Sequence, residues 1–179
     1  EHLLMVDMHH IISDGLSVEI LVHEFTALYG AEELPEIILQ YKDYAEWQNR
    51  EREKVSGQGA YWRNQFQEQI PVLDLPVDNA RPLVQDFAGS SIGFEIGREI
   101  AGALKALALE TETTLYMLLL AVYTVFLARL SGGEDIVIGS PVAGRRHADL
   151  EKIIGMFVNT LALRNYPVGD KTFLGFLAE

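Results

Sequence analysis

The chain has 179 residues, of which 49% are hydrophobic and 22% are charged, a composition typical of a globular protein rather than a disordered or fibrous one. Its 14 basic and 26 acidic residues give a net charge of −12, which would repel a phosphate backbone and argues against nucleic-acid binding. Cysteine is absent, which removes disulfides and zinc–thiolate sites and agrees with a reducing compartment, so we expect a cytoplasmic location.

The first elements expected along the chain are a strand and a helix joined by a loop. Residues 2–8 are short and apolar-rich, which predicts a strand. Leu21, Phe25 and Leu28 recur at helical spacing, which predicts a helix over residues 16–29. The histidine pair between them therefore lies in a loop at the exit of the strand.

The remaining chain is predicted to mix helices and strands. Residues 71–90 contain three prolines and no helical period, so we expect them to connect two parts of the chain. The apolar run over 115–130 has 16 residues, short of the roughly 20 that span a bilayer, and predicts a buried helix rather than a membrane span. Trp47 and Trp62, on amphipathic helices, are most simply core residues. Further helices are predicted over 41–54, 59–70, 98–111, 114–130 and 148–155, and further strands over 90–97, within 134–146 and over 159–168.

His9, His10, Asp14 and Gly15 form a compact motif at the predicted strand exit. A metal site is not expected, because adjacent residues at a strand end point to opposite faces and no further ligand cluster follows. Acid–base chemistry needs only one imidazole, whose ordinary pKa of about 6.5 suits it to accept a proton. His10 would then face a substrate, Asp14 would orient the imidazole or pair elsewhere to fix the loop, and Gly15 would give the turn its backbone freedom.

A structural interpretation of the same residues stays open at this point. His9 would pack in the core or cap, His10 would be solvated, and Asp14 would cap the following helix. Ser17 has two interpretations as well, a helix-opening serine or a donor to an oxyanion. Because short motifs often arise by chance, the rest of the chain has to decide between them.

The stretch HHIISDGLS resembles the HHxxxDG signature of condensation domains in nonribosomal peptide synthetases. Three further segments resemble that family's motifs in the expected order, and four ordered matches are hard to obtain by chance. They are YKDYAEWQ (41–48), YWRNQF (61–66) and GSPVAGRRHADLEKIIGMFVNTLALR (139–164). The resemblance covers essentially all 179 residues.

The resemblance implies a mixed α/β fold of two lobes that resemble chloramphenicol acetyltransferase and form a V, with the HHxxxDG loop at their junction. The family domain is considerably longer, so this chain is expected to be a fragment with part of each lobe. Residues 1–76 would end the first lobe, 77–90 would connect the lobes, and 91–179 would begin the second.

The activity implied is an acyl transfer that forms a peptide bond in the biosynthesis of nonribosomal peptides, a class of secondary metabolites that includes antibiotics. The two substrates would be thioesters on the 4′-phosphopantetheine arms of upstream and downstream carrier domains, beside an adenylation domain in one multidomain chain. No metal and no directly bound cofactor is expected, and the resemblance leaves open whether this fragment is active alone.

The resemblance also assigns roles to particular residues. His10 matches the family's catalytic histidine, with His9, Asp14 and Gly15 as supporting motif residues. The family aspartate forms a salt bridge with a later arginine, which matches Arg164 here, and Ser17 and Asn159 are cleft candidates. Arg145 and Arg146, beside a loop, are interpreted as solvated side chains, with contact to an acidic carrier domain as the alternative.

Three other functions remain as alternatives. An epimerisation domain of the same synthetases shares the histidine motif but usually has Trp after the Ser, where this chain has Val18. A free-standing acyltransferase that uses coenzyme A has an HxxxDG motif, but one histidine fewer. A noncatalytic docking module of the superfamily would have a decayed site, whereas the motif here is intact.

Overall fold

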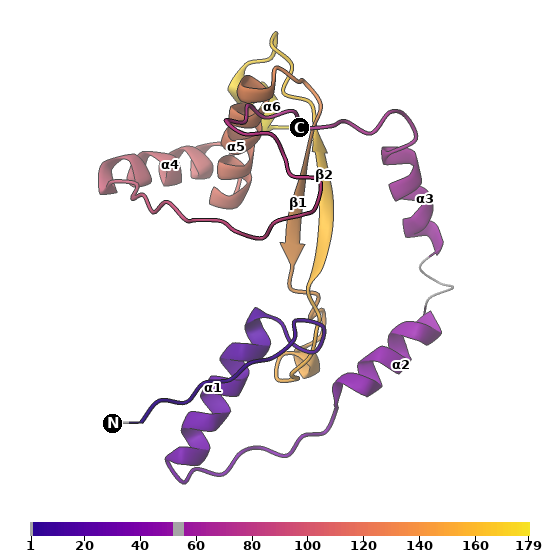
Figure 1. Cartoon of the computed structure of the whole chain (residues 1–179), viewed down its shortest axis with the longest axis vertical. Coiled ribbons are helices and arrows are strands. Elements are labelled where there is room, and N and C mark those ends of the chain that lie inside the picture. The colour runs from indigo at the N-terminus through magenta and orange to yellow at the C-terminus, as the bar shows by residue number, and fades with distance from the viewer. Residues whose placement is uncertain (1, 52–55) are drawn as a thin grey trace. The chain divides into compact units, whose positions relative to one another are not determined.

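The structure is a computed structural model that describes residues 2–51 and 56–179 (Figure 1). The strands β1 (Ile136–Val142) and β2 (Asn159–Asn165) are hydrogen-bonded into a two-stranded sheet, and Figure 1 shows them running in opposite directions. The helices are α1 (Gly15–Tyr29), α2 (Tyr41–Glu51), α3 (Ser56–Gln65), α4 (Arg98–Glu110), α5 (Leu115–Ser131) and α6 (Phe173–Leu177), with a 3-10 turn η1 at Ala148–Leu150.

The chain divides into two compact units. Unit 1 comprises Glu1–Glu68 and Gly139–Ala162, and unit 2 comprises Gln69–Ile138 and Leu163–Glu179. The first unit thus gathers two segments that are far apart in the sequence, and one of them carries the HHxxxDG motif. The lobe boundaries expected at 76 and 91 concern the longer family domain and stay a prediction.

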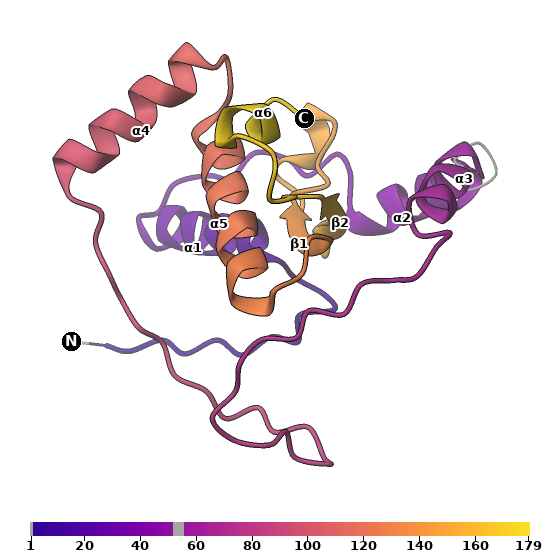
Figure 2. The ribbon, with the colours of Figure 1, turned by 90° about the horizontal axis from the view of Figure 1, so that it is seen from above.

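The core of unit 2 is built by α5 packed between α4 and α6, and Figure 2 shows α6 beside α5. Leu118 and Ala121 of α5 contact Phe176 and Leu177 of α6 in the buried cluster. The ends of α5 are defined locally. The Thr114 hydroxyl accepts a hydrogen bond from the Met117 N–H, and a glycine in the left-handed region follows the last turn.

The apolar helix expected over 114–130 forms, but only one of its faces is buried. Leu118 and Leu127 are 0% and 5% exposed, whereas Phe126 on the other face is 54% exposed. Among the described residues, no single helix is long and apolar enough to cross a membrane; α4 and α5, bent by 106° at their junction, pass that test only as a pair.

Several sequence predictions about local structure are confirmed and several are wrong. The helices α1, α4 and α5 and the strands β1 and β2 form where they were predicted. The strands predicted over 2–8 and 90–97 are absent, and Leu3 and Phe94 are 95% and 84% exposed. A strand needs a partner for its backbone groups, and apolar alternation alone does not supply one.

The predicted helices of unit 1 differ from the observed ones at their ends. For the helix predicted over 41–54, α2 is described to Glu51, and 52–55 lie outside the described residues. The helix predicted over 59–70 is shorter, since α3 ends at Gln65. Trp47 of α2 is 56% exposed and is not a core residue within this chain.

The helix predicted over 148–155 is reduced to the 3-10 turn η1. The guanidinium of Arg145 donates to the carbonyl oxygens of Leu150 and Ile153, at 2.5 and 2.6 Å. In a longer α-helix these oxygens would accept N–H groups from four residues further along. The Leu150 oxygen also accepts from the Ile153 N–H, three residues further along, at 3.3 Å, so the backbone here keeps 3-10 rather than α-helical spacing.

Candidate functional site

The two histidines of the motif are held in different tautomers by their own loop. His10 Nδ1 lies 2.7 Å from the carbonyl oxygen of Ser13, which can only accept, so Nδ1 carries the proton and donates. In the neutral imidazole of His10 the lone pair therefore sits on Nε2. His9 is the opposite case, because its Nδ1 accepts a hydrogen bond of 3.0 Å from the Ile11 N–H. Of the two, it is His10 that has its Nε2 set to accept a proton in the neutral form.

Asp14 is buried at the start of α1, with 2% of its surface exposed. It is the N-cap of the helix, since its Oδ1 accepts from the Ser17 N–H at 2.8 Å. The Ser17 hydroxyl lies 2.7 Å from the same oxygen, and the Phe157 N–H donates to Oδ2 at 3.1 Å. Asp14 therefore both caps α1 and bonds to a segment far along the chain, so the two interpretations of this residue are compatible.

The charged partner of Asp14 is Arg145, not Arg164 as expected from the family resemblance. Arg145 Nη2 lies 3.1 Å from Asp14 Oδ1, and the two side chains are 3% and 0% exposed. Arg164 pairs instead with Asp135, with 2.6 Å between Nη2 and Oδ2. Both members of each pair belong to the same compact unit, unit 1 for the first and unit 2 for the second.

Arg145 is buried and makes several polar contacts, so its interpretation as a solvated side chain is wrong. Four of its five N–H groups donate: Nη1 to two loop carbonyls, and Nη2 to Asp14 and to the Ser17 hydroxyl. Its guanidinium carbon lies 4.1 Å from the centroid of the Phe157 ring, a cation–π contact. Gly144, the residue before it, has a φ of 70°, which favours glycine, and a Cβ there would overlap the Phe157 carbonyl oxygen.

Ser17 does not lie in a cleft. Ser17 is fully buried, with 0% of its surface exposed. A substrate cannot reach its hydroxyl, so the structure does not support a role as donor to a substrate oxyanion. Its Oγ is within hydrogen-bond distance of both backbone groups of Gly155, 3.0 Å from the N–H and 2.8 Å from the carbonyl oxygen. Ser17 thereby connects α1 to the segment that carries Phe157.

Residues 155–157 are held from the other side by α2. The Tyr41 hydroxyl donates to the Met156 carbonyl oxygen at 2.7 Å, and its ring meets the Phe157 ring edge-on at 5.1 Å between centroids. A Cβ at Gly155 would overlap the Tyr41 ring. Two of the segments that resemble family motifs, 41–48 and 139–164, therefore pack closely against each other, although Tyr41 and Gly155 are 114 positions apart.

The environment of Asp14 favours its ionised form. Burial raises the pKa of the carboxyl, but hydrogen bonds from the Ser17 hydroxyl, the Ser17 N–H, the Phe157 N–H and Arg145 together outweigh it and lower the pKa to about 2. Asp14 is therefore a fixed anion at neutral pH. A carboxylate held this firmly acts as an anchor and not as a proton-transfer group.

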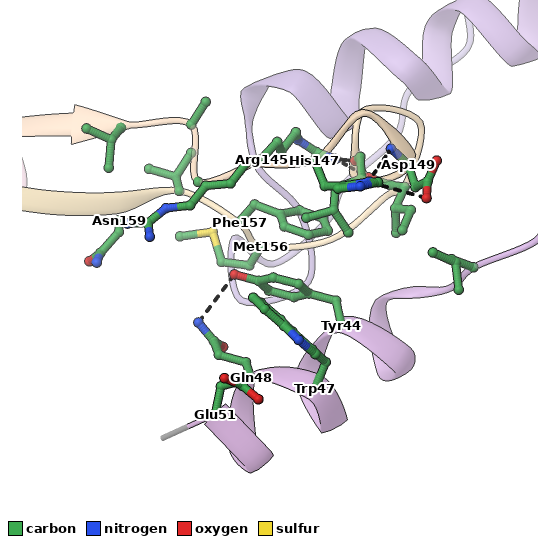
Figure 3. A pocket seen from close by; sticks show the side chains of 18 of the residues that line it. Tyr44, Trp47, Gln48, Glu51, Arg145, His147, Asp149, Met156, Phe157 and Asn159 are labelled. Carbon is green, nitrogen blue, oxygen red and sulfur yellow. Dashed lines mark hydrogen bonds and ion pairs between the residues drawn. The ribbon is translucent and has the colours of Figure 1, made fainter. Parts of the chain in front are cut away.

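A cavity of about 1340 Å³ lies in unit 1 between α2 and the loop that follows β1. Figure 3 shows Tyr44 and Trp47 of α2 beside Met156 and Phe157 in its lining, and the Tyr44 and Phe157 rings are in contact, with 4.7 Å between their centroids. Asn159 also lines this cavity, and its Oδ1 accepts from the Thr160 N–H at 2.9 Å. None of His10, Asp14 and Ser17 is among its lining residues, so the cavity is distinct from the histidine loop.

Gly15 is the motif residue whose identity the contacts explain least. A Cβ at Gly15 would meet nothing within 4 Å, so steric fit does not account for this glycine within the chain. Across residues 2–51 and 56–179, no three His, Cys, Asp or Glu side chains are grouped as metal ligands would be.

The chain is similar in sequence to one protein family and to much longer synthetases. The sequence profile of the family described as "Condensation domain" matches residues 1–179. A plipastatin synthase polypeptide of Bacillus subtilis (strain 168) is 56% identical over 180 residues, which cover 99% of this chain and 7% of that protein. Gramicidin S synthase 2 of Brevibacillus brevis is 53% identical over 180 residues, which cover 99% of this chain and 4% of that protein. The chain thus spans a small part of these much longer relatives.

The structure matches part of larger solved structures, as a mixed α/β fragment. The complex of the X-domain and OxyB from teicoplanin biosynthesis matches with a TM-score of 0.86 and 28% identity, over 96% of this chain and 40% of that chain. A four-domain nonribosomal peptide synthetase bound to AMP and glycine matches with a TM-score of 0.82 and 27% identity, over 95% of this chain and 13% of that chain.

Proposed function

Since this chain belongs to the condensation domain family, we propose that it is part of an enzyme domain that forms peptide bonds between two carrier-bound thioesters in nonribosomal peptide biosynthesis. The fold proposed for the complete domain is the two-lobed, chloramphenicol acetyltransferase-like one, of which this chain holds part of each lobe. The proposed partners are an upstream and a downstream carrier domain, each with a phosphopantetheine arm, and a neighbouring adenylation domain. The match to a four-domain synthetase bound to AMP and glycine supports this setting.

In the proposed reaction the α-amine of the acceptor attacks the thioester carbonyl of the donor. The new C–N bond replaces the C–S bond, and the donor arm leaves as a thiolate that ends as a thiol. The attacking nitrogen loses one proton, which His10 Nε2 would accept and pass on toward the leaving sulfur. Because thioesters are activated acyl donors, holding the amine in place matters as much as the basicity of the imidazole.

One observation carries the assignment of this role to His10 rather than His9. His10 Nδ1 donates to the Ser13 carbonyl oxygen at 2.7 Å, which directs the lone pair of the neutral ring to Nε2. Ser13 itself is buried beside Asp14, at 5% exposure, so the acceptor that orients the ring is fixed. His9 lacks this arrangement, since its Nδ1 is already an acceptor for the Ile11 N–H.

The test compares His10→Ala with His9→Ala in the complete domain that contains this chain. Single-turnover transfer from a donor-loaded to an acceptor-loaded carrier is measured for both variants. We expect His10→Ala to slow transfer by about 10²–10⁴-fold, the usual effect of losing a general base, and His9→Ala to slow it much less. Equal losses in the two folded variants, or wild-type transfer in His10→Ala, would contradict the assignment.

A docking module without catalytic activity is the second candidate. The similar X-domain is described in complex with OxyB, which is a statement about that protein. The intact pairing of Asp14 with Arg145 favours the catalytic proposal, because a recruiting surface does not require a fixed histidine loop. Transfer by the wild-type domain separates the two, since a docking module shows none.

A further inference from the structure

We propose that Ser17 is a positioning residue that fixes the His10 loop from inside the fold, an inference that rests on the proposed role of His10. The Ser17 hydroxyl has four polar neighbours within 3.1 Å: Asp14 Oδ1, Arg145 Nη2 and both backbone groups of Gly155. It is 0% exposed, so water does not compete for these contacts. One hydroxyl thus joins a carboxylate, a guanidinium and a distant stretch of backbone.

The path from Ser17 to His10 is short and runs through buried groups. Ser17 holds the carboxylate of Asp14 through both its hydroxyl and its N–H. Asp14 directly follows Ser13, whose carbonyl oxygen accepts from His10 Nδ1. A shift in the Asp14 backbone therefore turns the Ser13 carbonyl, and with it the plane and the tautomer of the His10 ring.

The contribution of Ser17 is separable from that of the ion pair. In a Ser17→Ala variant, Asp14 keeps Arg145 and the Phe157 N–H as partners, but it loses the hydroxyl. Gly155 loses the hydroxyl oxygen that accepts from its N–H, which is a direct link between α1 and residues 155–157. We therefore expect the charge on Asp14 to persist while the loop loses its exact placement relative to the ring of His10.

The expected kinetic effect is a loss in kcat with little change in the KM for either loaded carrier. Ser17 is buried and touches no substrate in this arrangement, so carrier binding should not depend on it. Misplacing a reacting group by about 1 Å costs up to about 10²-fold in rate. The variant should accordingly lose about 10- to 100-fold in kcat.

A matched control is available in Thr124, which is also 0% exposed. Its hydroxyl donates within α5, to the Leu120 carbonyl oxygen at 2.7 Å, and it lies in unit 2. Thr124→Val therefore removes one buried hydroxyl without touching the histidine loop. Comparing the two variants separates a positioning effect from the general cost of deleting a buried hydroxyl.

The deciding readout is the tautomer of His10, which is monitored by ¹⁵N NMR of the complete domain. A His9→Gln variant removes the neighbouring imidazole and so helps to assign the His10 signals. In the wild type and in Thr124→Val, the neutral ring should be protonated at Nδ1, as the contact with Ser13 requires. In Ser17→Ala the signal should shift toward the Nε2-protonated form. Because this readout needs no turnover, it can fail independently of the proposed condensation activity.

The proposal is overturned if Ser17→Ala keeps the wild-type His10 tautomer, or if it loses no more kcat than Thr124→Val. Should Ser17→Ala not fold, Ser17→Cys keeps a larger and weaker hydrogen-bonding group at this position, and the same two outcomes apply to it. A loss in kcat together with the tautomer shift, at unchanged KM, supports the proposal.

Discussion

Acidification should remove a defined share of the domain's stability through Asp14. The pKa of its carboxyl is lowered from 3.8 to about 2 in the folded chain, and each pKa unit corresponds to about 1.4 kcal/mol. The ionised form therefore contributes about 2.5 kcal/mol to the free energy of unfolding. Because folding lowers the pKa, this contribution is complete above about pH 5, has fallen by about 1 kcal/mol at about pH 3, and is lost as the pH passes below about 2.

The assay is urea unfolding of the complete domain between about pH 6 and about pH 3, for the wild type and for Asp14→Asn. The other carboxyls titrate in both proteins, so the difference between the two free energies of unfolding isolates Asp14. That difference should shrink by about 1 kcal/mol across the range. A constant difference would show that folding does not lower the pKa of Asp14, as would a wild-type Asp14 carboxyl that titrates by ¹³C NMR at or above 3.8.

Two further predictions concern the partners around this anchor. Double-mutant cycles of Asp14→Asn with Arg145→Leu should give a coupling energy of about 1–3 kcal/mol in unfolding experiments. The same cycle with Arg164→Leu should give less than about 0.5 kcal/mol. A larger coupling energy with Arg164 than with Arg145 would restore Arg164 as the partner of Asp14. Gly155→Ala should lower the free energy of unfolding by about 1–3 kcal/mol, because its Cβ overlaps the tyrosine ring that begins α2. Gly102→Ala, in the exposed part of α4 with nothing within 4 Å, is the control and should gain up to about 1 kcal/mol; equal effects at the two glycines would show that the fit to the ring is unimportant.

Elements with signals inside their own sequence could be predicted from the chain alone. The helix α1 has Asp14 at its N-cap and Gly30 after its last residue, and α5 has Thr114 and Gly132 in the same positions. The strand predicted over 2–8 had the apolar pattern but not a partner, and pattern alone does not bring two segments together. The five-residue α6 is too short to give a periodic signal.

The histidine motif could be recognised from the sequence, but the contacts that hold it could not. Both Arg145 and Arg164 lie in the segment that resembles the family motifs, 131 and 150 positions from Asp14. The choice between them depends on which segment folds back onto α1, and the two residues belong to different compact units. The same long-range packing buries Ser17, which in the sequence is only a polar residue near a helix start.

The most direct test of the proposed condensation activity is the intact mass of both carriers after mixing the complete wild-type domain with a donor-loaded and an acceptor-loaded carrier. We expect the acceptor carrier to gain the mass of the donor acyl group while the donor carrier loses it, and we expect His10→Ala to suppress this exchange. Unchanged carrier masses with a folded domain, across several aminoacyl pairs, would contradict it; if the donor then exchanged its α-proton in D₂O, epimerisation would replace condensation as the assigned reaction.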